Sequence, residues 1–115
     1  SKTEMIMLEA KSIIDIQGFP RSKWQIPEPP KNEGRENALD CEELDLIIVP
    51  GLAFDNKMRR CGQGAGYYDR FFSKLRDARQ KKNLKMPTLL GIGLPCQFVE
   101  EVPTDNFDHV LNAVM

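Results

Sequence analysis

The stretch PGLAFDNKMRRCGQGAGYYDR, from Pro50 to Arg70, collects residue types that bind phosphate groups. Three of its glycines alternate with other residues: Gly62, Gly64 and Gly66. Such glycines let backbone amides turn toward an anion without interference from a Cβ atom, and a helix that starts after them adds unpaired N–H groups and partial positive charge. Arg59 and Arg60 add fixed charge upstream. Asp69 offers the hard oxygen ligand that suits a magnesium ion carried by phosphates.

Glycine spacing by itself discriminates poorly between kinds of phosphate site. GQGAG is close to the start of the dinucleotide fingerprint GxGxxG, but a Rossmann turn follows its strand directly. Here the first glycine stands well after the preceding apolar run, so we discount that interpretation. The Walker motif GxxxxGK[ST] is absent from the sequence. The structural alternative is a tight strand-to-helix connection that binds no ligand.

The sequence predicts secondary-structure elements on both sides of this loop, and these must position it. Leu44–Val49 is an apolar, β-branched run that ends at Pro50-Gly51, which predicts a buried strand. A long loop is expected from Leu52 to Ala65, and a helix from about Gly66 to about Arg79. Its apolar face carries Tyr67, Phe71, Leu75 and Ala78, widened by Tyr68 and Phe72. Cations that suit the helix dipole gather toward its end: Lys74, Arg76, Arg79, Lys81 and Lys82.

Two further strands are expected after the helix. Thr88–Leu94 is a mostly apolar run that predicts a second buried strand, and Val110–Met115 predicts a third. The order strand, helix, strand, strand indicates a parallel sheet with helices packed on it.

The first forty residues give weaker signals. Met5–Leu8 is a short apolar run that we interpret as a strand. Ser12–Ile16 predicts one helical turn that ends at Gly18 and Pro20. The prolines of Trp24–Pro30 predict an extended segment. Residues 31–40 are polar and predict an exposed loop with a helical turn.

Composition limits the class of protein. The chain has 115 residues, of which 41% are hydrophobic and 29% charged, which is ordinary for one globular domain. A net charge of −1 without a basic arm argues against a nucleic-acid partner. The sequence has no membrane-spanning apolar run and no signal-peptide pattern. Three cysteines without CxxC spacing argue against a disulfide framework or zinc site and fit a reducing compartment.

The Pro50–Arg70 segment resembles the 5-formyltetrahydrofolate cyclo-ligase family. The family's pattern is similar to PGLAFDxxGxRLGxGxGYYDR, and the chain matches nearly all of it. Met58 stands where the family usually has glycine, and Cys61 replaces leucine. Other segments look like family segments in family order: SKWQIPEP (22–29), LLGIGL (89–94), VP (102–103) and FDHVLNAV (107–114).

The resemblance implies a fold and an activity. It implies an α/β fold with a mostly parallel sheet, flanking helices and a three-layer, Rossmann-like arrangement. Residues 1–115 would be a single domain that forms the carboxy-terminal part of a longer cyclo-ligase. The implied reaction is the ATP-dependent cyclisation of 5-formyltetrahydrofolate to 5,10-methenyltetrahydrofolate with release of ADP and phosphate. The alternative is a non-catalytic nucleotide- or folate-binding fragment, because an upstream half of the family's length is absent. We expect a cytoplasmic monomer that does not bind nucleic acid or membranes.

The resemblance also implies the site, with ATP and Mg²⁺ as its cofactors. The ATP loop would consist of Arg60, Cys61, Gly62, Gln63, Gly64, Ala65, Gly66, Tyr67 and Tyr68. The folate would contact Trp24, Gln63, Gly64, Ala65, Gly66 and Tyr67. Arg60 and Tyr67 would be catalytic. Asp69 and Asp108 would hold the metal.

Each of these roles competes with a structural one. Arg59 is expected at the surface. Of Tyr67 and Tyr68, one is expected in the core and one at the site. Trp24 fits a core anchor as well as a pterin-stacking residue, and Asp108 is equally open. We interpret the lone His109 as structural, and the cysteines as small buried hydrophobic residues.

Overall fold

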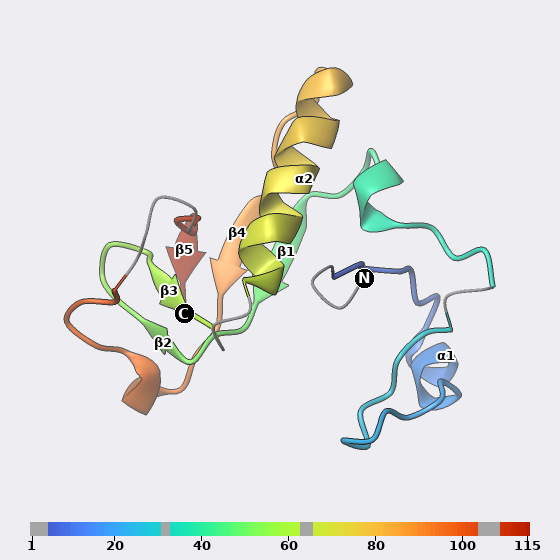
Figure 1. Cartoon of the computed structure of the whole chain (residues 1–115), viewed down its shortest axis with the longest axis horizontal. Coiled ribbons are helices and arrows are strands. Elements are labelled where there is room, and N and C mark those ends of the chain that lie inside the picture. Colours follow the sequence, from blue (N-terminus) through green and yellow to red (C-terminus); the bar gives the residue numbers. More distant parts are fainter. Residues whose placement is uncertain (1–4, 31–32, 63–65, 104–108) are drawn as a thin grey trace. The chain divides into compact units, whose positions relative to one another are not determined.

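The computed structural model of the chain describes residues 5–30, 33–62, 66–103 and 109–115 (Figure 1). The chain divides into two compact units, and we describe each by itself. The first unit consists of residues 1–5 and 42–115, and the second of residues 6–41. The prediction of a single domain over residues 1–115 stays a prediction.

A parallel sheet of three strands forms the centre of the first unit. Its strands are β1 (Leu46–Val49), β4 (Thr88–Gly91) and β5 (Ala113–Val114), in the order β1-β4-β5. β1 and β4 pair in parallel with Leu46 opposite Thr88, and β4 and β5 pair in parallel with Leu90 opposite Ala113. This confirms the predicted α/β fold with a parallel sheet.

The sheet has one buried face and one exposed face. Ile47 and Val49 of β1 are 5% and 0% exposed, whereas Leu46 and Ile48 are 49% and 56% exposed. β4 alternates in the same way. Successive side chains of a strand point to opposite faces, so the prediction that both runs are wholly buried was wrong for one of the two faces.

Helix α2 (Tyr67–Lys81) begins after the glycine-containing segment of residues 62–66 and leads to β4 (Figure 1). Its apolar stripe follows the predicted spacing, and Phe71, Phe72 and Leu75 are at most 1% exposed. Arg79 is also buried, and its guanidinium donates to the backbone oxygens of Glu42 and Leu44, just before β1. The expectation that this arginine serves mainly to complement the helix dipole was therefore incomplete, because it also ties the end of α2 to the start of the sheet.

A short hairpin replaces part of the long loop expected from Leu52 to Ala65. β2 (Ala53–Phe54) pairs antiparallel with β3 (Arg60–Cys61), with Phe54 opposite Arg60. The Phe54 ring is completely buried and packs so closely on β4 that a Cβ atom on Gly91 would lie 2.8 Å from it. Each strand has only two residues, too few to show an alternating pattern in the sequence.

The second unit contains the predicted helical turn but not the predicted strand. α1 (Ile13–Gln17) begins after Ser12, whose Oγ accepts from the Asp15 N–H, and ends at Gly18 as expected. The expected strand at Met5–Leu8 was wrong, because within residues 5–8 only Leu8 forms a β-bridge, with Asn37. The run is too short to nucleate a ladder against a polar loop.

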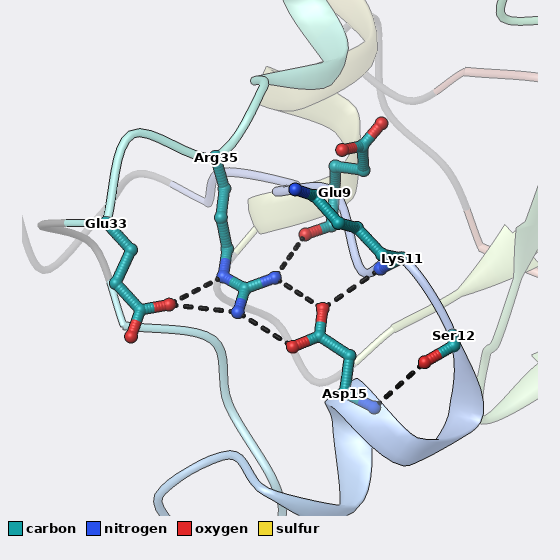
Figure 2. A network of polar contacts seen from close by, with 6 residues as sticks. All are labelled: Glu9, Lys11, Ser12, Asp15, Glu33 and Arg35. Carbon is teal, nitrogen blue, oxygen red and sulfur yellow. Dashed lines mark hydrogen bonds and ion pairs between the residues drawn. The ribbon is translucent and has the colours of Figure 1, made fainter.

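Figure 2 shows the polar network that organises the second unit. Arg35 forms a two-point contact with Asp15, with Nη1–Oδ2 and Nη2–Oδ1 distances of 2.6 and 2.9 Å. It also donates to Glu33 and to the backbone oxygen of Glu9. Its guanidinium lies 4.7 Å from the ring centre of Phe19, which is buried. One arginine thus joins α1 to the loop that leads into a 3-10 turn, η1 (Ala38–Asp40).

Other predictions for the second unit were partly correct. The 24–30 segment is largely extended, but Gln25 adopts a φ of 63° in a turn. The predicted helical turn in the loop of residues 31–40 is η1, and residues 31–32 lie outside the described residues.

The cysteines are more exposed than predicted. Cys41 and Cys61 are partly buried and Cys96 is exposed, so the expectation of buried cysteines was wrong. The short 3-10 turn η2 (Pro95–Gln97) holds Cys96 away from the core.

Within the described parts of the chain, no helix combines the length and the apolar character needed to cross a membrane.

Candidate functional site

The hairpin β2–β3 precedes the predicted phosphate loop in the sequence, and α2 follows it. β1 ends at Val49, and the hairpin follows after Pro50-Gly51. The Leu52 N–H donates to the Cys61 oxygen at 2.7 Å and closes the base of the hairpin. The connection that contains the hairpin and then the loop therefore follows the carboxyl end of the parallel strand β1, the edge at which open α/β sheets bind ligands. Gln63, Gly64 and Ala65 lie outside the described residues, so their roles remain predictions.

Arg60 folds over the beginning of this loop. Its Nε donates to the Pro50 oxygen at 2.9 Å, and its guanidinium carbon lies 4.9 Å from the ring centre of Tyr68. A Cβ atom on Gly62 would come within 2.7 Å of the Arg60 Nη2 atom. The structure therefore brings Arg60, Gly62 and Tyr68 together, with the guanidinium in space that a Cβ atom at position 62 would occupy.

Gly66 determines where α2 begins. It is the N-cap residue, with a φ of 70°, a left-handed conformation that glycine adopts without strain. Having no side chain, it cannot cap the helix itself. The first N–H groups of a helix have no acceptor within the helix. The helix end therefore presents donors and partial positive charge to an anion bound there.

Asp69 lies in the first turn of α2 and is partly buried. Its Oδ1 accepts a hydrogen bond from the backbone N–H of His109 at 3.0 Å. Asp108 precedes His109 in the sequence but lies outside the described residues, so the proposed pair of metal ligands is not tested. Among the residues that the structure describes, no three histidine, cysteine, aspartate or glutamate side chains gather in a metal-binding arrangement. A partly buried carboxylate beside a helix N-terminus nevertheless fits a hard cation that is also held by phosphates.

His109 itself is held by packing and a hydrogen bond. Its Nε2 lies 2.9 Å from the Ser73 Oγ, and its ring packs edge-on against Phe72 with 5.7 Å between ring centres. Both partners belong to α2. The histidine therefore fixes the backbone that meets Asp69, which confirms its interpretation as a structural residue.

Tyr67 and Tyr68 are both only partly buried. Tyr68 packs on Phe72 at a ring distance of 6.0 Å and also contacts the Arg60 guanidinium. Tyr67 is 40% exposed, with the Arg70 guanidinium 5.6 Å from its ring centre. Tyr68 is the more buried of the two but is not fully buried, so the expected core position is met in part, and the expected site role of the other tyrosine stays a prediction.

Trp24 belongs to the second unit and is 74% exposed, with the Lys23 ammonium 5.3 Å from its ring centre. The alternative that this ring anchors a core was therefore wrong. An exposed indole offers a flat area on which a ligand ring can stack. Its predicted contact with the pterin stays a prediction.

Sequence reasoning missed the pairing of Asp55 with Arg59. The Asp55 side chain is completely buried, and its Oδ2 lies 2.7 Å from the Arg59 Nε. Arg59 has a side chain that is only 19% exposed, so its predicted surface position was wrong. Burial by itself raises the pKa of Asp55, but hydrogen bonds from Val102, Arg59 and Lys57 outweigh it and lower the pKa from 3.8 to about 2. The four-residue spacing of the two charges was the available sequence signal.

Comparison with known proteins identifies the family. A profile of the 5-formyltetrahydrofolate cyclo-ligase family matches residues 1–115. The chain belongs to this family. A cyclo-ligase of Mus musculus is 32% identical over 111 residues, which cover 96% of this chain and 53% of the mouse protein. A probable cyclo-ligase of Schizosaccharomyces pombe is 41% identical over 97 residues, which cover 82% of this chain and 47% of the yeast protein.

The chain spans about half the length of these cyclo-ligases. A solved structure described as a 5,10-methenyltetrahydrofolate synthetase from Mycoplasma pneumoniae aligns with a TM-score of 0.47 and 24% identity. That alignment covers 61% of this chain and 37% of the solved chain.

Proposed function

We propose that this chain carries the nucleotide- and metal-binding part of a 5-formyltetrahydrofolate cyclo-ligase. The reaction is the ATP-dependent closure of 5-formyltetrahydrofolate to 5,10-methenyltetrahydrofolate, with ADP and phosphate as the other products. The placement of the Arg60 guanidinium against Gly62 and Tyr68, beside the N-terminus of α2, supports this proposal best. The family membership supports it independently.

The chemistry explains why a site of this kind suits the reaction. A formamide oxygen is a poor leaving group, so ATP first phosphorylates it to an iminophosphate. The N10 nitrogen then attacks the activated carbon, and phosphate departs. These steps require charge neutralisation and positioning more than acids and bases.

Within this proposal each group of the chain has one task. Arg60, partly buried and held by the Pro50 oxygen, neutralises charge on the transferred phosphoryl group. The loop amides and the first turn of α2 bind the remaining phosphate oxygens. Asp69 and Asp108 would hold Mg²⁺, which supplies further positive charge to the phosphates.

Two residues are proposed to contact the folate. Tyr67, at the exposed start of α2, borders the loop and is proposed to contact the reacting part of the folate. Trp24 is proposed to stack on the pterin. A cytoplasmic monomer completes the proposal, and analytical ultracentrifugation together with cell fractionation tests that part.

One observation favours a second candidate, a fragment that binds nucleotide or folate without turnover. The relatives are about twice as long as the part of them that this chain covers. A chain of this length would then bind ligands but would lack groups that the complete reaction requires.

The deciding experiment combines a binding assay with a turnover assay. Purified chain is titrated with MgATP by calorimetry and then incubated with MgATP and 5-formyltetrahydrofolate, while methenyltetrahydrofolate is followed by its near-ultraviolet absorbance. We expect binding that weakens about tenfold or more in Arg60→Ala. Arg76→Ala, which removes an exposed arginine of α2, serves as the control and leaves binding unchanged.

The outcomes separate the two candidates. Product that requires ATP establishes the enzyme. Binding without product supports the non-catalytic fragment. If wild type does not bind MgATP, or if Arg60→Ala binds it as tightly as wild type does, the nucleotide site is wrong.

A further inference from the structure

We propose that Asp55 is a positioning residue that selects which of two adjacent arginines lies at Gly62, the first glycine of the phosphate loop. By binding Arg59, it fixes the register of β3 so that Arg60 reaches Gly62 and Tyr68. The nucleotide role of Arg60 rests on the proposed function, whereas the selection itself is a property of the hairpin.

The Asp55 carboxylate collects four donors from two segments. Oδ1 accepts from the backbone N–H groups of Lys57 and Arg59 at 3.0 and 3.1 Å. Oδ2 accepts from the Arg59 Nε at 2.7 Å and from the Val102 N–H at 2.9 Å. Three of these donors lie within the hairpin turn, and the fourth lies in the segment that follows η2. The carboxylate therefore determines the shape of the turn and holds it to a neighbouring stretch of chain.

The register of the hairpin requires a further contact because its own hydrogen-bonded ladder is very short. Two residue pairs join β2 to β3, Ala53 with Cys61 and Phe54 with Arg60. A two-strand ladder of this length specifies its register weakly. Neighbouring side chains on a strand point to opposite faces, so a slip of one residue would exchange the directions of Arg59 and Arg60. The Asp55–Arg59 pair opposes that slip.

The two arginines occupy different surroundings as a result. Arg59 lies against buried Asp55, with exposed Glu101 3.8 Å from its Nη2. Its positive charge is thus already balanced within the protein. Arg60 has a backbone oxygen and an aromatic ring as its partners in the structure and lies against Gly62. Of the two, Arg60 is the arginine whose charge can be used on a phosphate.

A carboxylate is required at position 55 because all four contacts are donors to it. An ionised carboxylate is an acceptor only, whereas an amide of the same shape places an NH₂ group against some of these donors. Burial makes that mismatch costly, since a donor left unpaired in the interior loses its hydration without compensation. Asp55→Asn therefore tests the proposal with little change in volume.

The test measures Arg60 directly and then nucleotide affinity. Protons above an aromatic face resonate upfield, so NMR of wild type without nucleotide is expected to show upfield shifts of the Arg60 side chain from the Tyr68 ring. In Asp55→Asn we expect these shifts to be lost and MgATP affinity to fall about tenfold, as in Arg60→Ala. The double variant Asp55→Asn/Arg60→Ala is expected to bind no more weakly than Arg60→Ala alone, because the two changes remove the same contact.

Glu101→Gln is the matched control. It removes the other carboxylate near Arg59 but leaves the turn intact, and Glu101 is 78% exposed. Its effects on the Arg60 shifts and on affinity are expected to be below twofold. Circular dichroism establishes that each variant retains α2.

The failures of the two proposals can be told apart. If wild type does not bind MgATP, the proposed function fails, and the Arg60 shifts alone decide the role of Asp55. Unchanged Arg60 shifts in Asp55→Asn, or additive losses in the double variant, overturn the selection. If Asp55→Asn does not fold, amide exchange in wild type decides: protected N–H groups at Lys57, Arg59 and Val102 support the turn geometry, and unprotected ones overturn it.

Discussion

Asp15, a residue of the second unit, has a pKa below its ordinary value. Side-chain hydrogen bonds from Arg35, together with the Lys11 N–H, lower its pKa from 3.8 to about 2. Because the pKa in the folded state lies below the unfolded value of about 3.9, the contact stabilises the fold above pH 4. That stabilisation is lost as the pH falls toward 2, where the folded carboxylate takes up its proton.

A carboxyl-carbon NMR titration measures this directly. We expect a midpoint near 2 for Asp15 in wild type and a midpoint that moves toward about 3.9 in Arg35→Gln. Lys11→Gln keeps the backbone donor and is the control, with a much smaller change. The same midpoint in wild type and Arg35→Gln would contradict the contacts in Figure 2.

Arg79 and Arg76 offer a matched pair on one helix. Arg79 is 6% exposed and donates to two carbonyl oxygens before β1, whereas Arg76 is exposed. Arg79→Met removes a charged donor from both oxygens and is expected to lower the free energy of unfolding by about 2 kcal/mol. Arg76→Met is expected to stay within about 0.5 kcal/mol of wild type. Urea unfolding followed by circular dichroism measures both, and equal midpoints would argue against the anchoring role.

Among the elements, those with a strong local pattern were predictable from the sequence. α2 showed its 3.6-residue period through Phe71 and Leu75, and β1 showed its β-branched run. β2 and β3 gave no such signal, because two-residue strands have no period and their turn depends on Asp55, whose fourth donor is Val102, far along the chain. The exposure of Trp24 was equally unpredictable, since an indole suits a core as well as a surface.

Close packing between elements makes a specific prediction at β4. A Cβ atom on Gly91 would lie 2.7 Å from the Leu111 Cδ1 and 2.8 Å from the Phe54 ring, both of which are buried. Gly91→Ala is therefore expected to lower the free energy of unfolding by about 1–3 kcal/mol. Gly18→Ala is the control, because its Cβ atom would meet only ordinary contacts at 3.5 Å and beyond. Thermal unfolding of the two variants compares them, and equal melting temperatures would contradict the packing.

For the whole molecule, the candidate site could be predicted in part. The family pattern located Arg60, Gly62 and Gly66, and the structure gathers these positions around one end of α2. The pattern fixes an arginine at position 60 and leaves position 59 variable, but it did not reveal the contact that buries Arg59 against Asp55, because that contact forms only in the fold.

The exposed face of the sheet affects the solution behaviour of the whole chain. Ile48 is 56% exposed in the middle of β1, and the sequence isoelectric point is about 5.8. Near that pH little net charge opposes association through apolar residues. We expect light scattering at pH 5.8 to exceed that at pH 8, and Ile48→Lys to reduce it more than Gln80→Lys, which adds the same charge on α2. Equal reductions would show that charge alone is responsible.

The parallel pairing of β1 with β4 also determines the sequence of events by which the chain acquires its structure. Leu46 meets Thr88 only after the whole intervening stretch, α2 included, has been gathered into a closed loop. Helical turns of α2 need no such closure and form on a faster timescale. In stopped-flow refolding, helical ellipticity is therefore expected to rise before the amides of β4 become protected. During that interval the hydrophobic side chains of α2 have no sheet to cover, so the nascent helix is the segment at greatest risk of misassembly.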